Sequence, residues 1–320
     1  MRFSVIIPAR NEQANLERCL GSLFGLDWDP ADFEVLVVDH DSCDQTAGLA
    51  ARLGAQVIKG PPGATISGLR NLGARRARGE MLAFLDADCS VPANWLREAV
   101  RYLDRDDVVC FGSAPAPPDQ ANWVQKAWYQ IRRGKGEAAE TDWLESMNMF
   151  VRHREFNCVG WVDERLITCE DYDLSLRLGR VGKLVADPRV AAVHHGEAAS
   201  LGHFFRKEYW RGTSNLPGFL VHGASLRELP SVLLPVACAL TAATVLLFLL
   251  TGLLGRQELF LVLGVWLAFA WQTPLLLLAA WKSRDRFRLL ATLQLYLLLN
   301  LYFLARGGSL LSCRRGVSNG

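Results

Sequence analysis

The chain has 320 residues, of which 50% are hydrophobic and 21% are charged, and its formal net charge is +2. This length accommodates one large domain with an appendage, and the near-neutral charge argues against a nucleic-acid partner, because nucleic-acid-binding domains normally carry a clear basic excess. The eight cysteines are scattered, without the ligand spacing of a zinc site or the density of a disulfide framework.

From residue 1 to about 200, short apolar runs alternate with helical patterns, which predicts a Rossmann-like α/β domain with a mostly parallel sheet. No basic segment or long apolar run precedes the first strand, so we expect no cleavable signal peptide. The expected strands are Phe3–Ile7, Glu34–Val38, Ala55–Ile58, Met81–Leu85 and Val108–Gly112. The expected helices are Asn15–Phe24, Asp44–Leu53, Ser67–Arg78 and Asn94–Leu103, and Trp123–Arg132 and Trp143–Val151 form a second, less regular half.

Three long apolar segments with almost no internal charge follow, at about residues 233–254, 259–280 and 289–305. A membrane-spanning helix needs about 20 apolar residues, so the first two segments qualify and the third is short. We therefore predict an N-terminal α/β domain over residues 1–222, a small α-helical membrane domain over 229–306 with two or three transmembrane helices, and a tail over 307–320. His203–Arg211 mixes aromatic and cationic residues, which favours an interfacial helix on anionic headgroups over a solvated basic helix.

Basic residues in the loops indicate how the membrane part is oriented. The second loop carries Lys282, Arg284, Arg286 and Arg288, and the positive-inside rule places such a loop in the cytoplasm. The N-terminal domain lies on the same side if the first two segments span. We thus expect a multi-pass protein of the inner or plasma membrane with a cytoplasmic catalytic domain. The basic tail falls on the opposite side if the third segment also spans, so the sequence leaves the number of spans open.

The strand Met81–Leu85 ends in two carboxylates, Asp86 and Asp88. Mg²⁺ is usually held by one or two carboxylates together with substrate phosphates, and ligands of open α/β sheets bind beyond the carboxyl ends of the strands. The pair therefore indicates a metal ion that holds a phosphorylated substrate, against the alternative of a solvated Asp-rich turn.

Other polar residues follow the neighbouring strands or begin a later helix. Arg10 and Glu12 follow the first strand, Asp39 and His40 end the second, and Glu170-Asp171 precedes a helical pattern. Because the carboxyl ends of parallel strands converge, the strand-end residues line one crevice. Arg10 and Arg70 offer planar donor groups for phosphate or a nucleobase. Glu170 and Asp171 have two interpretations: they are catalytic carboxylates, or they are acidic residues that cap a helix N-terminus.

Together these motifs resemble the family 2 glycosyltransferases, which have the GT-A fold. In family order, the matching segments are Val5-Ile6-Ile7-Pro8-x-x-Asn11-Glu12, Val37-Val38-Asp39 with Ser42 and Asp44, Arg70-Asn71-x-Gly73, Ala77-x-Gly79, Asp86-Ala87-Asp88 and Glu170-Asp171-x-Asp173-Leu174-x-x-Arg177. Gly160-Trp161-Val162-Asp163-Glu164 is similar to the Gly-Gly-Phe-Asp-Glu loop of the family, with Trp161 in place of the second glycine. His40 and Arg10 differ from the usual family residues, which leaves the base of the donor open.

The resemblance implies a role for each matched residue. It implies that the donor is bound by Pro8, Arg10, Glu12, Asp39, His40, Arg70 and Asp86. Asp88, with Asp86 and His194, would bind Mn²⁺ or Mg²⁺ at the diphosphate, where the metal offsets charge on the leaving group. Asp171 would be the general base of a single inverting displacement, and the acceptor side would include Trp161, Asp163 and Glu170.

The overall interpretation is a membrane-anchored, metal-dependent, inverting glycosyltransferase that moves a sugar from a nucleotide-sugar donor to a lipid-linked or nascent polysaccharide acceptor. The Gln/Arg-x-x-Arg-Trp motif of processive synthases is absent from the sequence, so we expect addition of a single sugar. Two alternatives remain: a polyprenyl-phosphate sugar synthase, and a catalytically silent nucleotide-sugar-binding subunit of a membrane complex with unassigned partner proteins.

Overall fold

A computed structural model describes residues 1–132, 136–221, 226, 228–255, 257–283 and 289–311. The chain forms two compact units. Unit 1 comprises residues 1–119 and 132–196, and unit 2 comprises residues 120–131 and 197–320. Each unit is described separately below.

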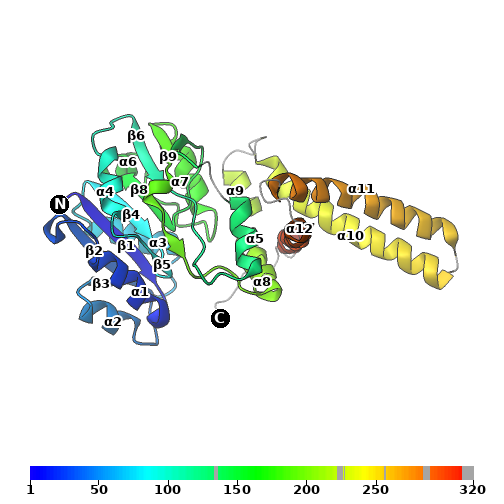
Figure 1. Ribbon diagram of the computed structural model, residues 1–320, viewed down its shortest axis with the longest axis horizontal. Coiled ribbons are helices and arrows are strands. Elements are labelled where there is room, and N and C mark those ends of the chain that lie inside the picture. Colours follow the sequence, from blue (N-terminus) through cyan, green and yellow to red (C-terminus); the bar gives the residue numbers. More distant parts are fainter. Residues whose placement is uncertain (133–135, 222–225, 227, 256, 284–288, 312–320) are drawn as a thin grey trace. The chain divides into compact units, whose positions relative to one another are not determined.

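The described part of unit 1 contains an eight-stranded sheet in the order β3-β2-β1-β4-β8-β6-β9-β7 (Figure 1). Its strands are β1 (Phe3–Ala9), β2 (Phe33–Asp39), β3 (Gln56–Lys59), β4 (Met81–Leu85), β6 (Val108–Gly112), β7 (Ala139–Glu140), β8 (Asn148–Arg152) and β9 (Lys183–Ala186). The strands from β3 to β4 are mutually parallel, β8 runs antiparallel to both β4 and β6, and β7 runs antiparallel to β9. A separate antiparallel pair joins β5 (Cys89–Ser90) to β10 (Val193–His194).

Helices cover both faces of the main sheet, because successive side chains of its strands point to opposite faces. Along β1, Phe3, Val5 and Ile7 belong to one buried layer and Ile6 to the other. The first layer includes side chains of α1 (Gln13–Phe24), α2 (Thr46–Arg52) and α4 (Trp95–Ala99). The second includes side chains of α3 (Ile66–Arg76), α6 (His153–Cys158) and α7 (Glu170–Leu178). Unit 1 is thus a three-layer α/β/α structure.

The expected α/β pattern is confirmed with two differences in detail. Asn94–Leu103 divides into α4 and a short 3₁₀-helix, Val100–Tyr102. The segment Trp143–Val151, expected to belong to a less regular half, instead supplies β8 at the centre of the sheet. Every residue of β8 is buried. A strand buried on both faces lacks the alternation of polar and apolar residues that identifies a half-exposed strand.

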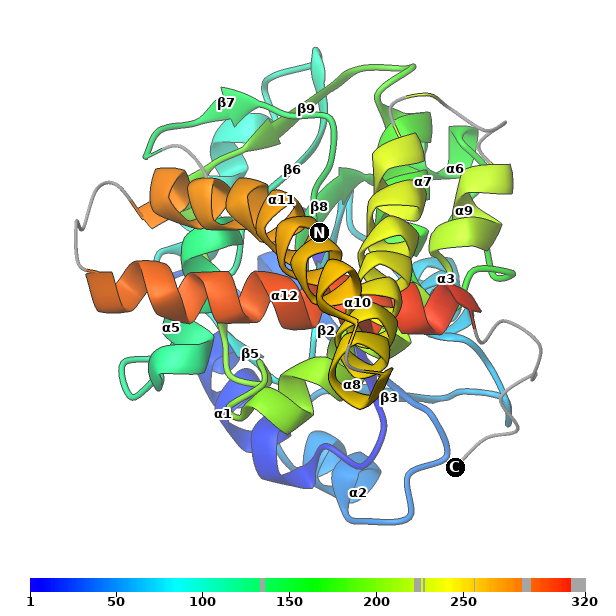
Figure 2. The ribbon, with the colours of Figure 1, turned by 90° about the vertical axis from the view of Figure 1, so that its right-hand side faces the viewer.

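Unit 2 is helical. Its helices are α5 (Trp123–Arg132, whose last residue falls in unit 1), α8 (Leu201–Gly212), α9 (Asn215–Val221), α10 (Leu229–Gly255), α11 (Glu258–Ser283) and α12 (Leu289–Leu311). By length and composition, α10, α11 and α12 could each cross a membrane, with mean hydropathies of 2.5, 1.9 and 1.4. In both ribbon views α10 and α11 lie side by side and α12 runs crosswise to them (Figure 2).

The position of β8 generates a stability prediction. The Phe150 ring lies 4.7 Å from the Phe111 ring and 4.6 Å from the Trp95 ring, measured between centroids. Phe150→Ala would leave a cavity in the middle of the sheet, and we expect it to lower the free energy of unfolding by about 3–5 kcal/mol. Chemical denaturation in detergent measures this. Phe24→Ala, at a ring that is 45% exposed, is the matched control and should cost about 0.5 kcal/mol; equal losses would contradict the central position of Phe150.

Candidate active site

The loops after β1 and β2 form one wall of the candidate site. Both turn sharply, with left-handed backbone at Asn11 (φ 54°) and Asp41 (φ 52°). Asn11 holds the two loops together, because its side-chain oxygen accepts the backbone N–H of Cys43 at 2.9 Å and its own N–H donates to the Ser42 hydroxyl at 3.0 Å. The polar residues at the two strand ends are thereby kept next to each other.

A pocket of about 240 Å³ opens at these strand ends. Its lining comes from the end of β1, the loops after β1, β2 and β4, and helix α3. It consists of Pro8, Ala9, Arg10, Glu12, His40, Ile66, Leu69, Asp86, Ala87 and Asp88. Burial and the carboxylates of Asp88, Asp86 and Asp44 raise the pKa of Glu12, although Asn15 donates a hydrogen bond to it at 2.9 Å. The structure therefore brings together six residues expected at the donor or metal site: Pro8, Arg10, Glu12, His40, Asp86 and Asp88.

Asp39 lies at the end of β2 and is 6% exposed. One carboxylate oxygen, Oδ2, accepts the backbone N–H of Ser42 at 3.3 Å. The other, Oδ1, is buried and has no hydrogen-bond partner among the described residues. A buried acceptor without a partner is costly to leave unmet, so this oxygen is suited to receive an N–H or O–H from a ligand.

Arg70 lies outside the lining of the pocket, although its planar donor group would suit a ligand. Its side chain is 2% exposed, and its guanidinium donates to Asp86 Oδ1 at 2.9 Å and to Glu170 Oε1 at 2.8 Å. The helix that carries it, α3, begins at a capped turn in which Thr65 Oγ1 accepts the N–H of Gly68. Arg70 thus joins the end of β4 to the start of α7 through one buried cation.

Glu170 and Asp171 form the first turn of α7, directly after Cys169 in a left-handed conformation (φ 66°). Asp171 accepts the backbone N–H groups of Tyr172 at 2.8 Å and Ser146 at 3.4 Å. Burial raises the pKa of both carboxyls, and the neighbouring charge of Asp171 raises the pKa of Glu170 further, while Arg70 acts in the opposite direction. A carboxylate with a raised pKa is a better proton acceptor than an ordinary aspartate.

Asp88 lies next to His194 because β5 pairs with β10. His194 is 5% exposed, and its Nε2 lies 3.2 Å from Asp88 Oδ2. The possible ligand atoms of Asp88, Cys89 and His194 lie within 4.8 Å of one another. Gly196 packs so closely on the Asp88 carboxylate that no room remains for a β-carbon. The sequence analysis missed Cys89 and Gly196; the position of Cys89 directly after Asp88 was the only signal for either.

The loop that contains Trp161 and Asp163 lies outside the lining of the pocket. Trp161 adopts a left-handed backbone (φ 74°), and its ring contacts Phe156 at 5.6 Å and the Arg75 guanidinium at 5.0 Å, measured to the ring centroid. The Arg165 guanidinium pairs with Asp163 and lowers its pKa. Asn71, another residue that sequence reasoning left without a role, anchors the loop through two backbone hydrogen bonds to Val162.

Comparison with known proteins identifies the domain. The Glycosyl transferase family 2 profile matches residues 4–156. Glycosyltransferase AglE of Haloferax volcanii is 26% identical over 234 residues, which cover 70% of this chain and 76% of AglE. A beta-monoglucosyldiacylglycerol synthase of Synechocystis is 27% identical over 67% of this chain, and the match spans 50% of that synthase.

Solved structures share the fold. The mannosyltransferase PcManGT of Pyrobaculum calidifontis, solved with GDP-Man and Mn²⁺, matches with a TM-score of 0.64 over 98% of this chain and 88% of its own, at 16% identity. TarS 1–349 of S. aureus, solved with UDP-GlcNAc, matches with a TM-score of 0.51 over 68% of this chain and 67% of its own, at 21% identity. These identities are too low to carry function, so the two structures establish the fold alone.

The family profile and the glycosyltransferase relatives thus identify an enzyme of the glycosyltransferase class. The chain carries a Glycosyl transferase family 2 domain with the GT-A fold, which confirms the prediction made from its motifs.

The buried position of Arg70 generates a second prediction. Arg70→Met would leave the carboxylates of Asp86, Glu170 and Asp171 without their cation, and removing one partner of a buried ion pair typically costs about 3–5 kcal/mol. Without the cation, the pKa values of Glu170 and Asp171 in the folded protein rise further, because Arg70 now lowers both. The loss should therefore be largest at high pH and shrink as pH falls and the carboxyls take up protons.

Thermal unfolding in detergent across a pH series measures this loss. Arg76→Met, at an exposed arginine of the same helix, is the matched control and should change little at any pH. A destabilisation of Arg70→Met that does not vary with pH would contradict the proposed electrostatic role.

Proposed function

We propose that this protein is a membrane-anchored, inverting glycosyltransferase that transfers a single sugar from a nucleotide-sugar donor to a hydroxyl group on a lipid-linked or nascent saccharide acceptor. The observation that carries the proposal is the pocket at the ends of β1, β2 and β4. In this pocket His40 and Arg10, which we propose bind the nucleobase, lie with the acidic pair Asp86 and Asp88.

The residues at the strand ends support binding of the nucleotide part of a donor. Asp39 Oδ1 is a buried acceptor without a partner, which suits an N–H of a nucleobase. Asp86 is oriented by Arg70, and its position in the pocket lining suits a ribose hydroxyl. We propose that Pro8, Arg10, Glu12 and His40 complete this part of the site.

The donor atoms near Asp88 fit a divalent cation. The ligands would be the carboxylate of Asp88, the neutral imidazole of His194 and phosphate oxygens of the substrate. This set suits Mn²⁺, whereas Mg²⁺ prefers a set richer in oxygen. In the metal-free protein, burial and the nearby carboxylates of Asp86 and Asp88 raise the pKa of the Cys89 thiol. A bound ion would act as a Lewis acid that offsets charge on the departing diphosphate.

Asp171 is the proposed general base. Hydrogen bonds from two backbone N–H groups fix its carboxylate, and burial raises its pKa. It would take the proton of the acceptor hydroxyl as that oxygen attacks the anomeric carbon from the face opposite the diphosphate. One displacement inverts the anomeric configuration. The positive charge of Arg70 offsets the negative charge of the Glu170–Asp171 pair. Trp161, Asp163 and Glu170 are proposed to shape the acceptor side.

The lipid-linked acceptor is proposed from the C-terminal helices and from the relatives. Three apolar helices long enough to cross a membrane follow the catalytic part of the chain, and an enzyme with a soluble acceptor needs no such anchor. The matched Synechocystis relative is named as a synthase of a glucosylated diacylglycerol, which is consistent with an acceptor at a membrane.

A panel of nucleotide sugars tests the proposal. The full chain in detergent would be assayed for donor binding and hydrolysis with Mn²⁺, with Mg²⁺ and with a chelator. We expect one donor to respond, the response to require metal, and Asp88→Asn to remove it. Binding that persists in chelator and in Asp88→Asn would contradict the metal site. Donor binding without turnover would favour a catalytically silent nucleotide-sugar-binding subunit, and no response to any donor would contradict the proposal.

Asp171→Asn tests the general base. Loss of general-base catalysis typically lowers the rate about 10²- to 10⁴-fold, so we expect kcat to fall by that factor while donor binding is kept. Near-normal activity would favour a polyprenyl-phosphate sugar synthase, because a phosphate oxygen needs little help from a base. Asp142→Asn, at an exposed aspartate, is the matched control.

The pH profile gives an independent measure of the same residue. Burial raises the pKa of Asp171, and the base works only when ionised. The acid limb of kcat/KM should therefore fall as pH drops through a pKa above the usual value of about 3.9 for an aspartate. An acid limb unchanged in Asp171→Asn would assign the titration to another group.

Gly196→Ala tests the packing around Asp88. The added β-carbon collides with the Asp88 carboxylate, so we expect metal-dependent donor binding to weaken by about 10- to 100-fold, as for other residues that orient metal ligands. Gly21→Ala, where a β-carbon meets nothing within 4 Å, is the matched control. Titration of Mn²⁺ in the presence of the donor measures both variants, and equal affinities would contradict the importance of this contact.

A further inference from the structure

Helix α12 contacts the other two apolar helices near one end of the pair that they form. The Tyr296 hydroxyl donates to Gln272 of α11 at 2.8 Å, and the hydroxyls of Thr292 and Ser283 lie 2.7 Å apart. Farther along α12, Gly307 packs on the backbone carbonyl of Pro235 in α10. These contacts fall in the second half of α11 and the first third of α10, which are antiparallel, so they lie toward the same end of the pair.

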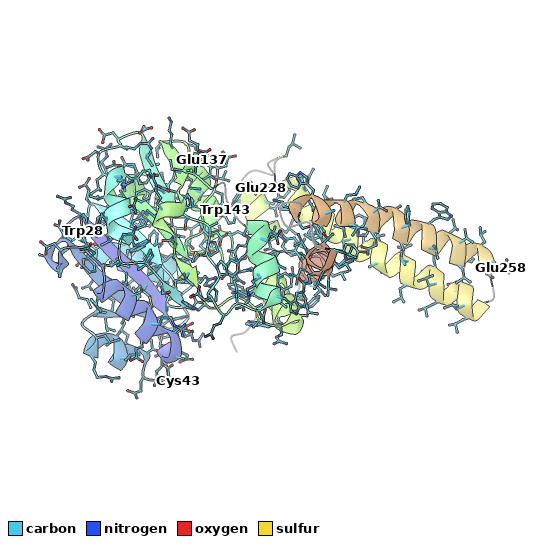
Figure 3. All side chains as sticks on the ribbon, viewed as in Figure 1. Trp28, Cys43, Glu137, Trp143, Glu228 and Glu258 are labelled. Carbon is cyan, nitrogen blue, oxygen red and sulfur yellow. The ribbon has the colours of Figure 1, made fainter. Side chains whose placement is uncertain are left out.

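The remainder of α10 and α11 forms a hairpin of its own. Near its closed end Gly252 packs on Leu261, and the Phe248 and Phe260 rings lie 5.6 Å apart. The outward side chains there are exposed and apolar, for example Leu247 at 60% and Leu254 at 84%. The two helices project beyond α12, and the labelled Glu258 marks the closed end (Figure 3). Exposed leucines on both helices fit a lipid environment.

A different side of α12 is covered by amphipathic helices that carry charge. Trp128 of α5 packs on Phe204 of α8 and on Tyr302 of α12, at 4.9 and 5.6 Å between ring centroids. Leu298 of α12 belongs to the same buried cluster. Helix α8 also contains four charged residues, Arg206, Lys207, Glu208 and Arg211.

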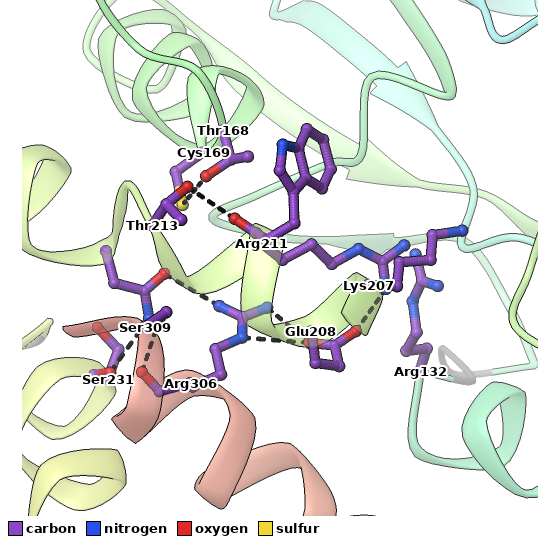
Figure 4. A network of polar contacts seen from close by, with 12 residues as sticks. Arg132, Thr168, Cys169, Lys207, Glu208, Arg211, Thr213, Ser231, Arg306 and Ser309 are labelled. Carbon is purple, nitrogen blue, oxygen red and sulfur yellow. Dashed lines mark hydrogen bonds and ion pairs between the residues drawn. The ribbon is translucent and has the colours of Figure 1, made fainter. Parts of the chain in front are cut away.

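Buried ion pairs join α8 to α12. The Arg306 guanidinium of α12 donates to Glu208 Oε2 at 3.0 Å and to Asn215 Oδ1 at 3.0 Å, and the Glu208 side chain is fully buried (Figure 4). Arg211 pairs with both Glu208 and Glu197. At Gly212 a β-carbon would collide with Ser309 of α12. Helices α8 and α12 therefore move as one body.

We infer that α12 lies in the plane of the membrane surface and that α10 and α11 alone cross the bilayer. If α12 crossed, the charged helix α8 would accompany it into the hydrocarbon, which charged side chains strongly oppose. When α12 lies in the plane of the membrane surface, it faces the acyl chains, and the charged side chains of α8 stay among the headgroups. This inference refines the membrane anchoring of the proposed function and is independent of the sugar chemistry.

The dimensions of the hairpin agree with this arrangement. Residues 240–255 of α10 extend past the α12 crossing by about 24 Å at 1.5 Å per residue. A surface helix lies about 5–10 Å into the boundary between headgroups and acyl chains. The two lengths together match a hydrocarbon core of about 30 Å.

The arrangement also removes the conflict in the distribution of basic residues. With two crossings, the basic loop that begins at Lys282 and the basic tail that contains Arg314 and Arg315 lie on the same side of the membrane. Residues 284–288 and 312–320 lie outside the described structure, so only their charges enter this argument. Both segments then satisfy the positive-inside rule.

Topology mapping of the full chain in its native membrane tests the inference. Epitope tags would be placed at the N-terminus, after Gln257, after Asp285 and after Gly320, one per protein, and probed with protease in sealed vesicles of each orientation. We expect the tag after Gln257 on one side and the other three on the opposite side. A C-terminal tag on the side opposite the Asp285 tag would show that α12 crosses, and would overturn the inference.

A matched pair of charge insertions provides a second test that needs no tag. Leu247→Lys places an ammonium in the middle of the projecting part of α10, and Leu297→Lys places one on the exposed side of α12, where it can reach the headgroups. We expect the fraction of protein that resists alkaline extraction to fall several-fold for Leu247→Lys and to stay near the parent value for Leu297→Lys. Equal losses would overturn the inference. Donor binding by the solubilised protein is scored separately, so failure of the topology is distinguishable from failure of the proposed function.

Discussion

The contact on which the candidate site depends is the buried guanidinium of Arg70 between Asp86 and Glu170. Asp86 follows β4, and Glu170 begins α7, so one cation fixes the relative positions of two segments that are far apart in the sequence. Three carboxyls near one another would otherwise repel and take up protons. With Arg70 in place, burial can raise the pKa of Asp171 without leaving the whole cluster uncharged. The structure of the site and the proposed proton transfer therefore depend on the same buried cation.

Much of unit 1 could be predicted because its strands end in polar residues at a common edge. The runs before Asp39 and Asp86 are apolar and end abruptly, and the structure brings the residues beyond them to one pocket. Strand pairing between distant segments left no local pattern. The family resemblance implied that His194 joins Asp88, but the two-residue strands that bring them together are too short for any periodic signal. The burial of Arg70 was likewise hidden, since a cation on a helix is usually solvated. The roles of the site residues stay a prediction.

In unit 2 the sequence predicted the positions of the apolar helices but not how each of them lies in a membrane. Composition identifies a segment that is apolar enough to enter a membrane, but it cannot tell a helix that crosses from one that lies along the surface. That difference depends on neighbours such as Glu208 and Phe204 of α8, which contact α12 from a separate part of the chain. The short apolar run of α12 and its lower mean hydropathy, 1.4 against 2.5 for α10, were the local signs of a different environment.

Gly196 packs on the carboxylate of Asp88, the residue proposed to hold the metal. Gly196 is the last residue of unit 1, and unit 2 resumes at Glu197. Because the Asp88 carboxylate leaves no space for a β-carbon there, the backbone at residue 196 cannot shift toward it without displacing it. The position of the carboxylate proposed to hold the metal is therefore set in part by the backbone that packs on it, and not by side chains alone.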